Sequence, residues 1–365
     1  MMEGKYKRVA IKVGSNVLTR ADGTLDVTRM SSLVDQIAQL RMRGIEVILI
    51  SSGAVASGRS ELRSAAEQLK KLDGVEQRQL FSAVGQAKLI NRYYELFREY
   101  GIPVGQVLTM KENFSTRRHY LNQRSCMMVM LDNGVLPIVN ENDTVSVTEL
   151  MFTDNDELSG LIATMMDVQA LVILSNVDGV YNGAPGSPGV SVIPIVRQGK
   201  ELGEYITAVK SDFGRGGMMT KCNIAHKVAD EGVEVIIANG KRDNILPALL
   251  FGDDDVVCTR FLPSKSVISS VKKWIAHSGG FVKGEIVLNE TAVEKITGEK
   301  ALSILPVGVI AVNGDFEKDD LVRIVAFDKR ELGIGRVAYN SCEARELMGV
   351  HDCKPIVHYD YLYIG

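Results

Sequence analysis

The sequence predicts an α/β protein in which a mostly parallel sheet is sandwiched by helices, followed by a small, mainly β domain. Short apolar segments alternate with helix-like segments up to about residue 250, which is typical of a parallel sheet covered on both faces. Beyond that point, short β-prone pieces follow one another between Gly, Asn and Asp turns. The chain has 365 residues, which favours two domains. We expect a first domain over 1–260, a linker over 261–278 and a second domain over 279–365.

Composition excludes several classes of protein. Hydrophobic residues make up 45% of the chain and charged residues 24%, with a net charge of −3, so no overall basic field points to nucleic acid or a membrane surface. Residues 279–365 carry 10 Lys and Arg against 14 Asp and Glu, so the tail is acidic. No apolar run reaches the ~18 residues of a membrane span. The five cysteines form no CxxC pair, which favours reduced thiols and a cytoplasmic location.

The first predicted strand, residues 7–13, ends in a glycine turn. Lys12 occupies its penultimate position, where a lysine is costly unless its ammonium meets an anion at the end of the strand. The alternative is an edge strand from which Lys12 reaches solvent. Gly14 would let the backbone approach a ligand closely. The turn matches neither a P-loop nor a dinucleotide fingerprint.

The next predicted elements are a helix over 28–43 and a strand over 46–50. Ser51, Ser52 and Gly53 follow that strand and suit a carboxylate or phosphate cradle, although helix capping by serine is the alternative. A helical stretch over 76–100 contains Gly85, which suggests close helix packing. A strand is expected over 104–108.

Two polar clusters then flank one connection. The apolar strand 135–139 runs into Asn140–Asp143, and Asp154, Asn155 and Asp156 precede a helix over 158–166. Ligands of open α/β sheets bind outside the carboxyl ends of the strands. The clusters therefore indicate a charged substrate, a hard cation or both, while loop and capping roles remain the alternative.

A third group of polar residues follows the strand 171–174, where Ser175 and Asn176 stand. Gly216 and Gly217 then open a predicted helix, Met218–Glu231, with Lys221 on its first turn. Exposed N–H groups, the positive end of the helix dipole and a lysine together suit nucleotide phosphates; a plain glycine hinge is the alternative. A strand over 234–238 comes next.

These pieces favour phosphoryl transfer, in which the protein positions the reactants and neutralises charge. Lys12 and Lys221 could hold the transferring group from opposite sides. Asp154 or Asp156 could fix the lysines or bind Mg²⁺ through water. An acceptor that is itself a carboxylate would need no general base, because it is already ionised near neutral pH.

The ordered motifs resemble those of the bacterial glutamate 5-kinase family. They are Ala10–Ser15, Ser51–Ala54, Ala83–Gln86, Val139–Asp143, Asp154–Asp156 and Gly216–Lys221. The tail, with Gly284–Val287 and Leu305–Val309, resembles a PUA domain. The resemblance implies an amino-acid-kinase fold. It also implies ATP-dependent phosphorylation of the L-glutamate γ-carboxylate, the first step of proline synthesis.

The candidate residues fall into four sets, and the resemblance supports most of them by matching position. The catalytic set is Lys12, Lys221 and Asp156. The glutamate-binding set is Ser52, Gly53, Asp143 and Asn155. The nucleotide-binding set is Lys12, Gly14, Ser175, Asn176, Gly216, Gly217, Met218, Met219, Thr220 and Lys221. Asp154 and Asp156 are the candidates for Mg²⁺. Ser175-Asn176 and Arg215 depart from the usual family residues and leave nucleotide preference open.

The resemblance further implies feedback inhibition by proline and a homo-oligomer, either a dimer or a tetramer. No membrane partner is expected, and the acidic tail gives little attraction for nucleic acid. Two other hypotheses remain. A related amino-acid or carbamate kinase would share the fold, and an RNA-binding accessory would act through the tail. A dehydrogenase is disfavoured because the dinucleotide fingerprint is missing.

Overall fold

A computed structural model of the chain describes residues 5–65, 69, 71–114, 117–145, 155–185, 187–199, 202, 217–252, 256–264, 274–275, 282–298, 302–351 and 353–364. The chain divides into two compact units. One comprises Met1–Asn113 and Asn122–Val267, and the other Phe114–Leu121 and Ile268–Gly365. The domain limits expected from the sequence stay a prediction.

The first unit is built on an eight-stranded sheet with the order β3-β4-β2-β1-β5-β7-β8-β6. Its strands are β1 (Arg8–Val13), β2 (Glu46–Ser51), β3 (Val104–Thr109), β4 (Leu136–Glu141), β5 (Ala170–Ser175), β6 (Ile195–Val196), β7 (Glu234–Asn239) and β8 (Thr259–Phe261). All neighbouring pairs are parallel except β7 and β8, which are antiparallel. The mostly parallel sheet predicted from the sequence is confirmed.

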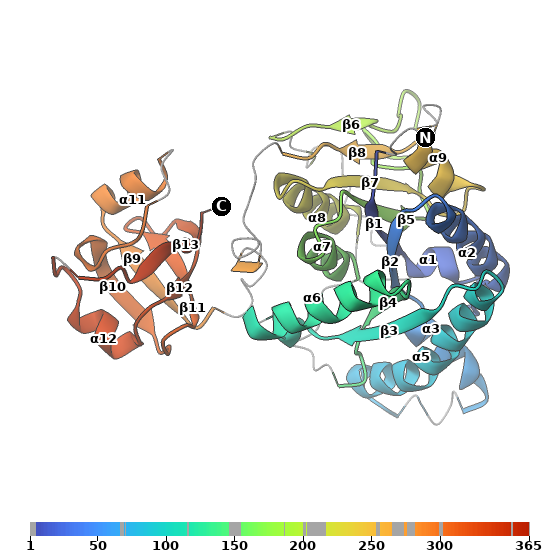
Figure 1. The fold of residues 1–365 in the computed structure, drawn as a ribbon, viewed down its shortest axis with the longest axis horizontal. Helices are drawn as coiled ribbons and strands as arrows, with labels where there is room; N and C mark the ends of the chain where they lie inside the picture. The colour runs from blue at the N-terminus through green and yellow to red at the C-terminus, as the bar shows by residue number, and fades with distance from the viewer. Residues whose placement is uncertain are drawn as a thin grey trace. The chain divides into compact units, whose positions relative to one another are not determined.

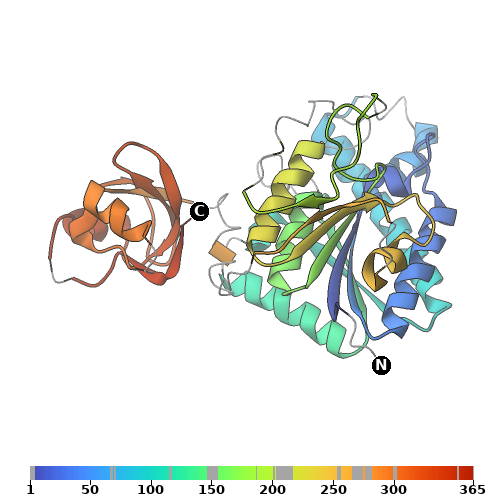
Figure 2. The same cartoon turned by 90° about the horizontal axis from the view of Figure 1, so that it is seen from above.

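Helices cover both faces of this sheet (Figures 1 and 2). They are α1 (Ser15–Leu18), α2 (Val27–Met42), α3 (Ala54–Glu61), α5 (Gly74–Arg98), α6 (Arg117–Asp132), α7 (Asn155–Met165), α8 (Met218–Asp230) and α9 (Ile245–Phe251), with 3₁₀ turns η1 (Arg63–Ala65) and η2 (Lys111–Phe114). Helices α7 and α8 pack on one face, and α2 and α9 on the other (Figure 2). Among the described residues, no helix is long and apolar enough to cross a membrane.

The alternation of side chains along β1 decides which face Lys12 occupies. Val9, Ile11 and Val13 are buried in the apolar cluster that contains the core residues of α2. Successive side chains of a strand point to opposite faces of the sheet. Lys12 therefore points to the other face, toward α7, and it is only 5% exposed. An edge strand is excluded, because β1 pairs with both β2 and β5.

The carboxyl ends of the central parallel strands lie along one edge of the sheet. The chain passes from β1 to β2 on one side of β1, and later returns as β5 on its other side. The order reverses between β1 and β5, and such a switch point opens a crevice for ligands. Gly14 joins the ends of these two strands, because its amide donates a hydrogen bond to the carbonyl of Leu174 at 3.1 Å.

Helices α3 and α5 pack with their backbones in contact. A Cβ atom on Gly85 would lie 1.8 Å from the carbonyl oxygen of Ala54, and one on Gly58 would lie 1.8 Å from that of Phe81. The close helix packing predicted from Gly85 is confirmed. Helix α3 is not among the helices predicted from the sequence, because its residues, AVASGRSE, form no apolar stripe. Asp73 fixes the start of α5 through a capping box with Glu76.

The second unit contains a five-stranded sheet with the order β10-β9-β11-β12-β13. Its elements are β9 (Gly284–Leu288), α11 (Glu290–Ile296), η5 (Pro306–Gly308), β10 (Val309–Gly314), β11 (Leu321–Ala326), β12 (Glu331–Val337), α12 (Ser341–Glu346) and β13 (Val357–Ile364). Residues such as Ile286, Ile324 and Val357 form a separate apolar core. A small, mainly β domain is thus confirmed.

We predict that Gly85→Ala destabilises the first unit by about 1–3 kcal/mol, because the added methyl group forces α5 away from α3. Thermal unfolding measures the effect. Gly74→Ala is the matched control, because it lies on the same helix with open space around its Cβ position and should leave the melting temperature unchanged or slightly higher. Equal melting temperatures for the two variants would contradict the close contact.

Candidate active site

The centre of the site is a buried carboxylate held between two lysines. Lys12 Nζ lies 2.5 Å from Asp156 Oδ1, and Lys221 Nζ lies 2.9 Å from Asp156 Oδ2. Asp156 is only 1% exposed, and the side chains of Lys12 and Lys221 are 6% and 12% exposed. Three elements that are far apart in the sequence, β1, α7 and α8, therefore meet at one carboxylate.

The position of Asp156 follows from the start of α7 and from the packing of α7 on α8. Asp156 stands in the first turn of α7, where the positive end of the helix dipole favours a carboxylate. Farther along α7, Gly160 faces α8, and a Cβ atom there would lie 2.9 Å from a methyl carbon of Val228 and 3.0 Å from one of Ile224. The missing side chain lets the helices approach, and this brings Lys221 within reach of Asp156.

Electrostatics keeps the Asp156 carboxyl ionised. Burial alone would raise its pKa, but the ammonium groups of Lys12 and Lys221 outweigh burial and lower the pKa from 3.8 to about 2. The cluster carries two ammonium groups against one carboxylate, a net charge of +1. Such a buried positive cluster can attract and hold an anion.

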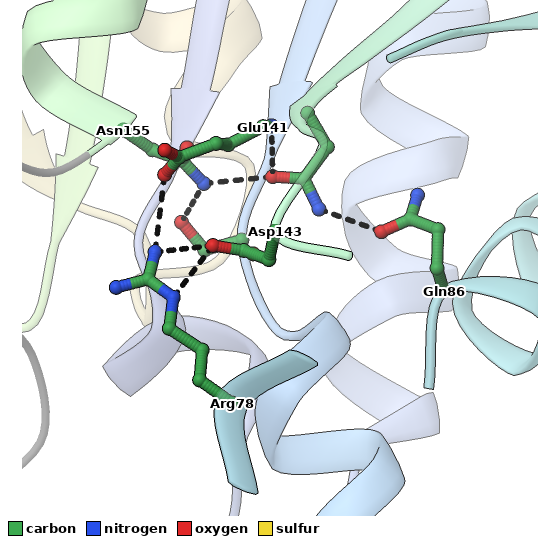
Figure 3. A network of polar contacts seen from close by, with 7 residues as sticks. Arg78, Gln86, Glu141, Asp143 and Asn155 are labelled. Carbon is green, nitrogen blue, oxygen red and sulfur yellow. Dashed lines mark hydrogen bonds and ion pairs between the residues drawn. The ribbon is translucent and has the colours of Figure 1, made fainter. Parts of the chain in front are cut away.

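A network of amide and hydroxyl groups adjoins this cluster through Asn155, the neighbour of Asp156 in sequence (Figure 3). Asn155 Nδ2 donates to Ser52 Oγ and to Asn140 Oδ1, both at 3.0 Å. Asn140 Nδ2 in turn donates to Gln86 Oε1 at 2.8 Å. Gly53 is the N-cap residue before α3 and has a φ of +109°, a conformation that glycine adopts readily. The ends of β2 and β4 thus meet the starts of α3 and α7.

An arginine completes the network (Figure 3). Arg78 Nε donates to Asp143 Oδ1 at 2.6 Å, and Arg78 Nη2 donates to Glu141 Oε2 at 3.0 Å and also contacts Asp143. Glu141 is 2% exposed and Asp143 is 5% exposed. Two buried carboxylates therefore share the guanidinium of Arg78.

The candidate phosphate residues lie at the ends of β1 and β5 and at the start of α8. Ser175 is buried, and its Oγ lies 3.4 Å from Asn176 Oδ1. Gly217 caps α8, and the space around its Cβ position is open. Met218, Met219 and Thr220 form the first turn that leads to Lys221. Free amides at this helix start, together with Lys221, suit a phosphate chain.

The described residues fit nucleotide phosphates better than a directly bound metal ion. Each oxygen of Asp156 already faces an ammonium group, so the carboxylate is poorly placed for direct coordination. No cluster of three or more His, Cys, Asp or Glu residues suited to a metal ion occurs among the residues that the structure describes. Asp154 and Gly216, which the sequence predicts as metal-binding and nucleotide-binding residues, lie outside the described residues.

The sequence analysis gives no individual binding role to Arg78, Gln86 or Glu141, although Gln86 and Glu141 lie in the motifs Ala83–Gln86 and Val139–Asp143. Arg78 and Gln86 stand eight residues apart, about two helical turns, on the same side of α5. For Arg78, this spacing from Gln86 is the one signal in the sequence, and it becomes informative only because Gln86 contacts Asn140. Glu141 belongs to the polar cluster that follows the predicted strand 135–139, and the structure extends this strand so that Glu141 is the last residue of β4.

Comparisons with known proteins identify relatives of both parts of the chain. The model of the amino acid kinase family matches residues 7–239, and the PUA domain model matches residues 284–359. A glutamate 5-kinase from Bacteroides thetaiotaomicron is 69% identical over 363 residues, covering 100% of both chains. One from Chlorobaculum tepidum is 45% identical over 361 residues, covering 98% of both. A UMP kinase structure from Bacillus anthracis shares the fold, with a TM-score of 0.50 and 16% identity over 72% of this chain and 99% of that one.

The pKa of Asp156 predicts a specific dependence of stability on pH. Because the folded-state pKa is lowered from 3.8 to about 2, its contribution is present above pH 3.8 and is lost as the pH falls toward 2. We expect the stability advantage of the wild type over Asp156→Asn to shrink by about 2 kcal/mol across this range, as measured by urea unfolding.

The matched control is Asp243→Asn, whose carboxyl is almost fully exposed. The stability of this variant should follow that of the wild type at every pH. If the difference in unfolding free energy between the wild type and Asp156→Asn stays constant down to pH 2, the Asp156 carboxylate is not held by the lysines.

Proposed function

The chain belongs to the amino acid kinase family, among the glutamate 5-kinases, and we propose that it transfers the γ-phosphoryl group of ATP to the γ-carboxylate of L-glutamate. This reaction is the first step of proline synthesis. The observation that carries the proposal is the adjacency of two sites. Asn155 donates hydrogen bonds to Ser52 and Asn140, and the next residue, Asp156, holds two lysines together. The first site suits an amino acid, and the second suits a phosphoryl group in transfer.

On the donor side, the lysines neutralise charge. Lys12 comes from the end of β1 and Lys221 from the start of α8, so their ammonium groups can contact phosphate oxygens from two directions. Asp156 keeps both lysine side chains in place when no nucleotide is bound. It also limits the repulsion between the two ammonium groups. Gly14, Ser175, Asn176 and Gly217–Lys221 bind the nucleotide in this proposal. Preorganised cations of this kind stabilise the charge of a phosphoryl transition state.

On the acceptor side, the amide and hydroxyl network orients the substrate. Ser52, Gly53 and Asn155 bind L-glutamate, and Asp143 binds its ammonium group. The γ-carboxylate is ionised at neutral pH, so it attacks without a general base. The role of the protein is to align it with the γ-phosphorus, and alignment alone can supply a large part of a rate enhancement.

We propose that Mg²⁺ enters with ATP and is held mainly by phosphate oxygens and water, since Asp156 faces the lysines. The ion would neutralise phosphate charge. A water-mediated contact with Asp154 or Asp156 remains part of the proposal. We further propose inhibition by proline at the glutamate site, a dimeric or tetrameric assembly and a cytoplasmic location, all supported by the resemblance to glutamate 5-kinases.

The function is tested by ADP release from ATP–Mg²⁺ in a coupled assay with a panel of acceptors. We expect turnover with L-glutamate, little or none with carbamate, aspartate or N-acetylglutamate, and less turnover when proline is added. Turnover with another acceptor and none with L-glutamate would overturn the proposal.

The role of Lys221 is tested by Lys221→Ala. We expect kcat to fall about 100- to 1000-fold, because one preorganised donor to a charged transition state is worth about 3–4 kcal/mol. Lys88→Ala is the matched control. Lys88 pairs with Glu61 at the surface, and its loss should leave kcat unchanged. A kcat near the wild-type value in Lys221→Ala would remove Lys221 from the catalytic set.

A further inference from the structure

We propose that Arg78 is a specificity-determining residue that binds the α-carboxylate of the acceptor amino acid. The inference rests on the proposed function and extends it to a residue that neither the motifs nor the resemblance assigns. Arg78 lies in the second turn of α5, on the side of that helix that also carries Gln86. Its guanidinium therefore stands at the rim of the network that holds Ser52 and Asn155 (Figure 3).

The guanidinium of Arg78 is held in place by two of its nitrogens, and its third nitrogen is available for a further hydrogen bond. Nε and Nη2 donate to Asp143 and Glu141. Among the residues that the structure describes, Nη1 has no hydrogen-bond partner, and Figure 3 shows the third nitrogen pointing away from both carboxylates. The side chain of Arg78 is 17% exposed, so the group remains accessible. A rigid guanidinium with an unused edge is well suited to bind a carboxylate.

The charges also match an α-amino acid. The α-carbon of L-glutamate carries an ammonium group and a carboxylate side by side. Asp143 and Arg78 offer a carboxylate and a guanidinium side by side, and the bond between Nε and Oδ1 fixes their separation. If Asp143 receives the ammonium group, Arg78 is a cation in direct contact with Asp143 and is therefore available for the α-carboxylate. Glu141 then serves to hold the guanidinium, which explains why a buried glutamate ends β4.

A purely structural role is the competing explanation. Burying two carboxylates without a cation is strongly unfavourable, and Arg78 would be required for that reason alone. The two explanations differ in their dependence on the substrate. A structural arginine supports turnover of every acceptor equally. An arginine that binds the α-carboxylate matters only for acceptors that possess one.

4-Aminobutyrate provides the necessary probe, because it keeps the ammonium group and the reacting carboxylate of L-glutamate but lacks the α-carboxylate. We would measure ADP release with both compounds for the wild type, Arg78→Gln and Arg78→Lys. Arg78→Lys keeps the positive charge beside Glu141 and Asp143, so this variant should fold even if Arg78→Gln does not.

For L-glutamate, we expect kcat/KM to fall about 10- to 100-fold in either variant, mainly through a higher KM, because one charge-assisted hydrogen bond is lost. For 4-aminobutyrate, we expect kcat/KM of Arg78→Lys, which keeps the positive charge beside Asp143, to change less than about threefold. If turnover of 4-aminobutyrate is too slow to measure, its inhibition constant against L-glutamate replaces kcat/KM in the comparison.

An equal loss for both compounds would overturn the inference and leave Arg78 with a structural role. An unchanged kcat/KM for L-glutamate would overturn it as well. These outcomes are separate from a failure of the proposed function, which would appear as a wild-type enzyme that does not turn over L-glutamate.

Discussion

The ion pairs of Asp156 with Lys12 and Lys221 are the constraint on which the site depends. A buried carboxylate needs compensating charge, and two partly buried lysines need an anion. Each group is therefore stable only if β1, α7 and α8 all reach the same point. This requirement fixes the start of α7 beside the carboxyl ends of the central strands. It also keeps two cations close together without a bound phosphate, which is the preorganisation that electrostatic catalysis requires.

Small residues make the necessary approach of the helices possible. Gly160 brings α7 close to α8, and Gly58 and Gly85 bring α3 into backbone contact with α5. The first contact determines whether Lys221 reaches Asp156. The second places Gln86 beside Asn140 and holds α5 over the end of β4. A larger side chain at any of these positions would displace a helix, and the polar groups would then lose their partners. The glycines therefore act on the chemistry through distance rather than through contact with a substrate.

The sequence was most informative where one residue contradicted its surroundings. Lys12 in an apolar strand required a buried anion, and alternation along β1 then gave its direction. The acidic pair Asp154 and Asp156 indicated charge at a strand end, but not which residue faces the lysines. Arg78 could not be recognised, because an arginine in a polar amphipathic helix looks like an ordinary solvent-exposed residue. The three-residue strand β8 is too short to give a pattern, and its pairing with β7 is set by tertiary contacts.

The order of residues at the start of α7 explains how one short segment can contact both the amide network and the lysine pair. Consecutive residues of a helix point about 100° apart, so Asn155 and Asp156 face different neighbours although they share a peptide bond. One lies in the network with Ser52 and Asn140, and the other lies between the lysines. The distance between the amide network and the lysine pair is therefore set by helix geometry rather than by loop conformation. All residues of α7 except Asn155 and Glu157 are buried, so the helix cannot shift without disturbing the core. A reaction that depends on alignment is thus tied to one of the most thoroughly packed elements of the fold.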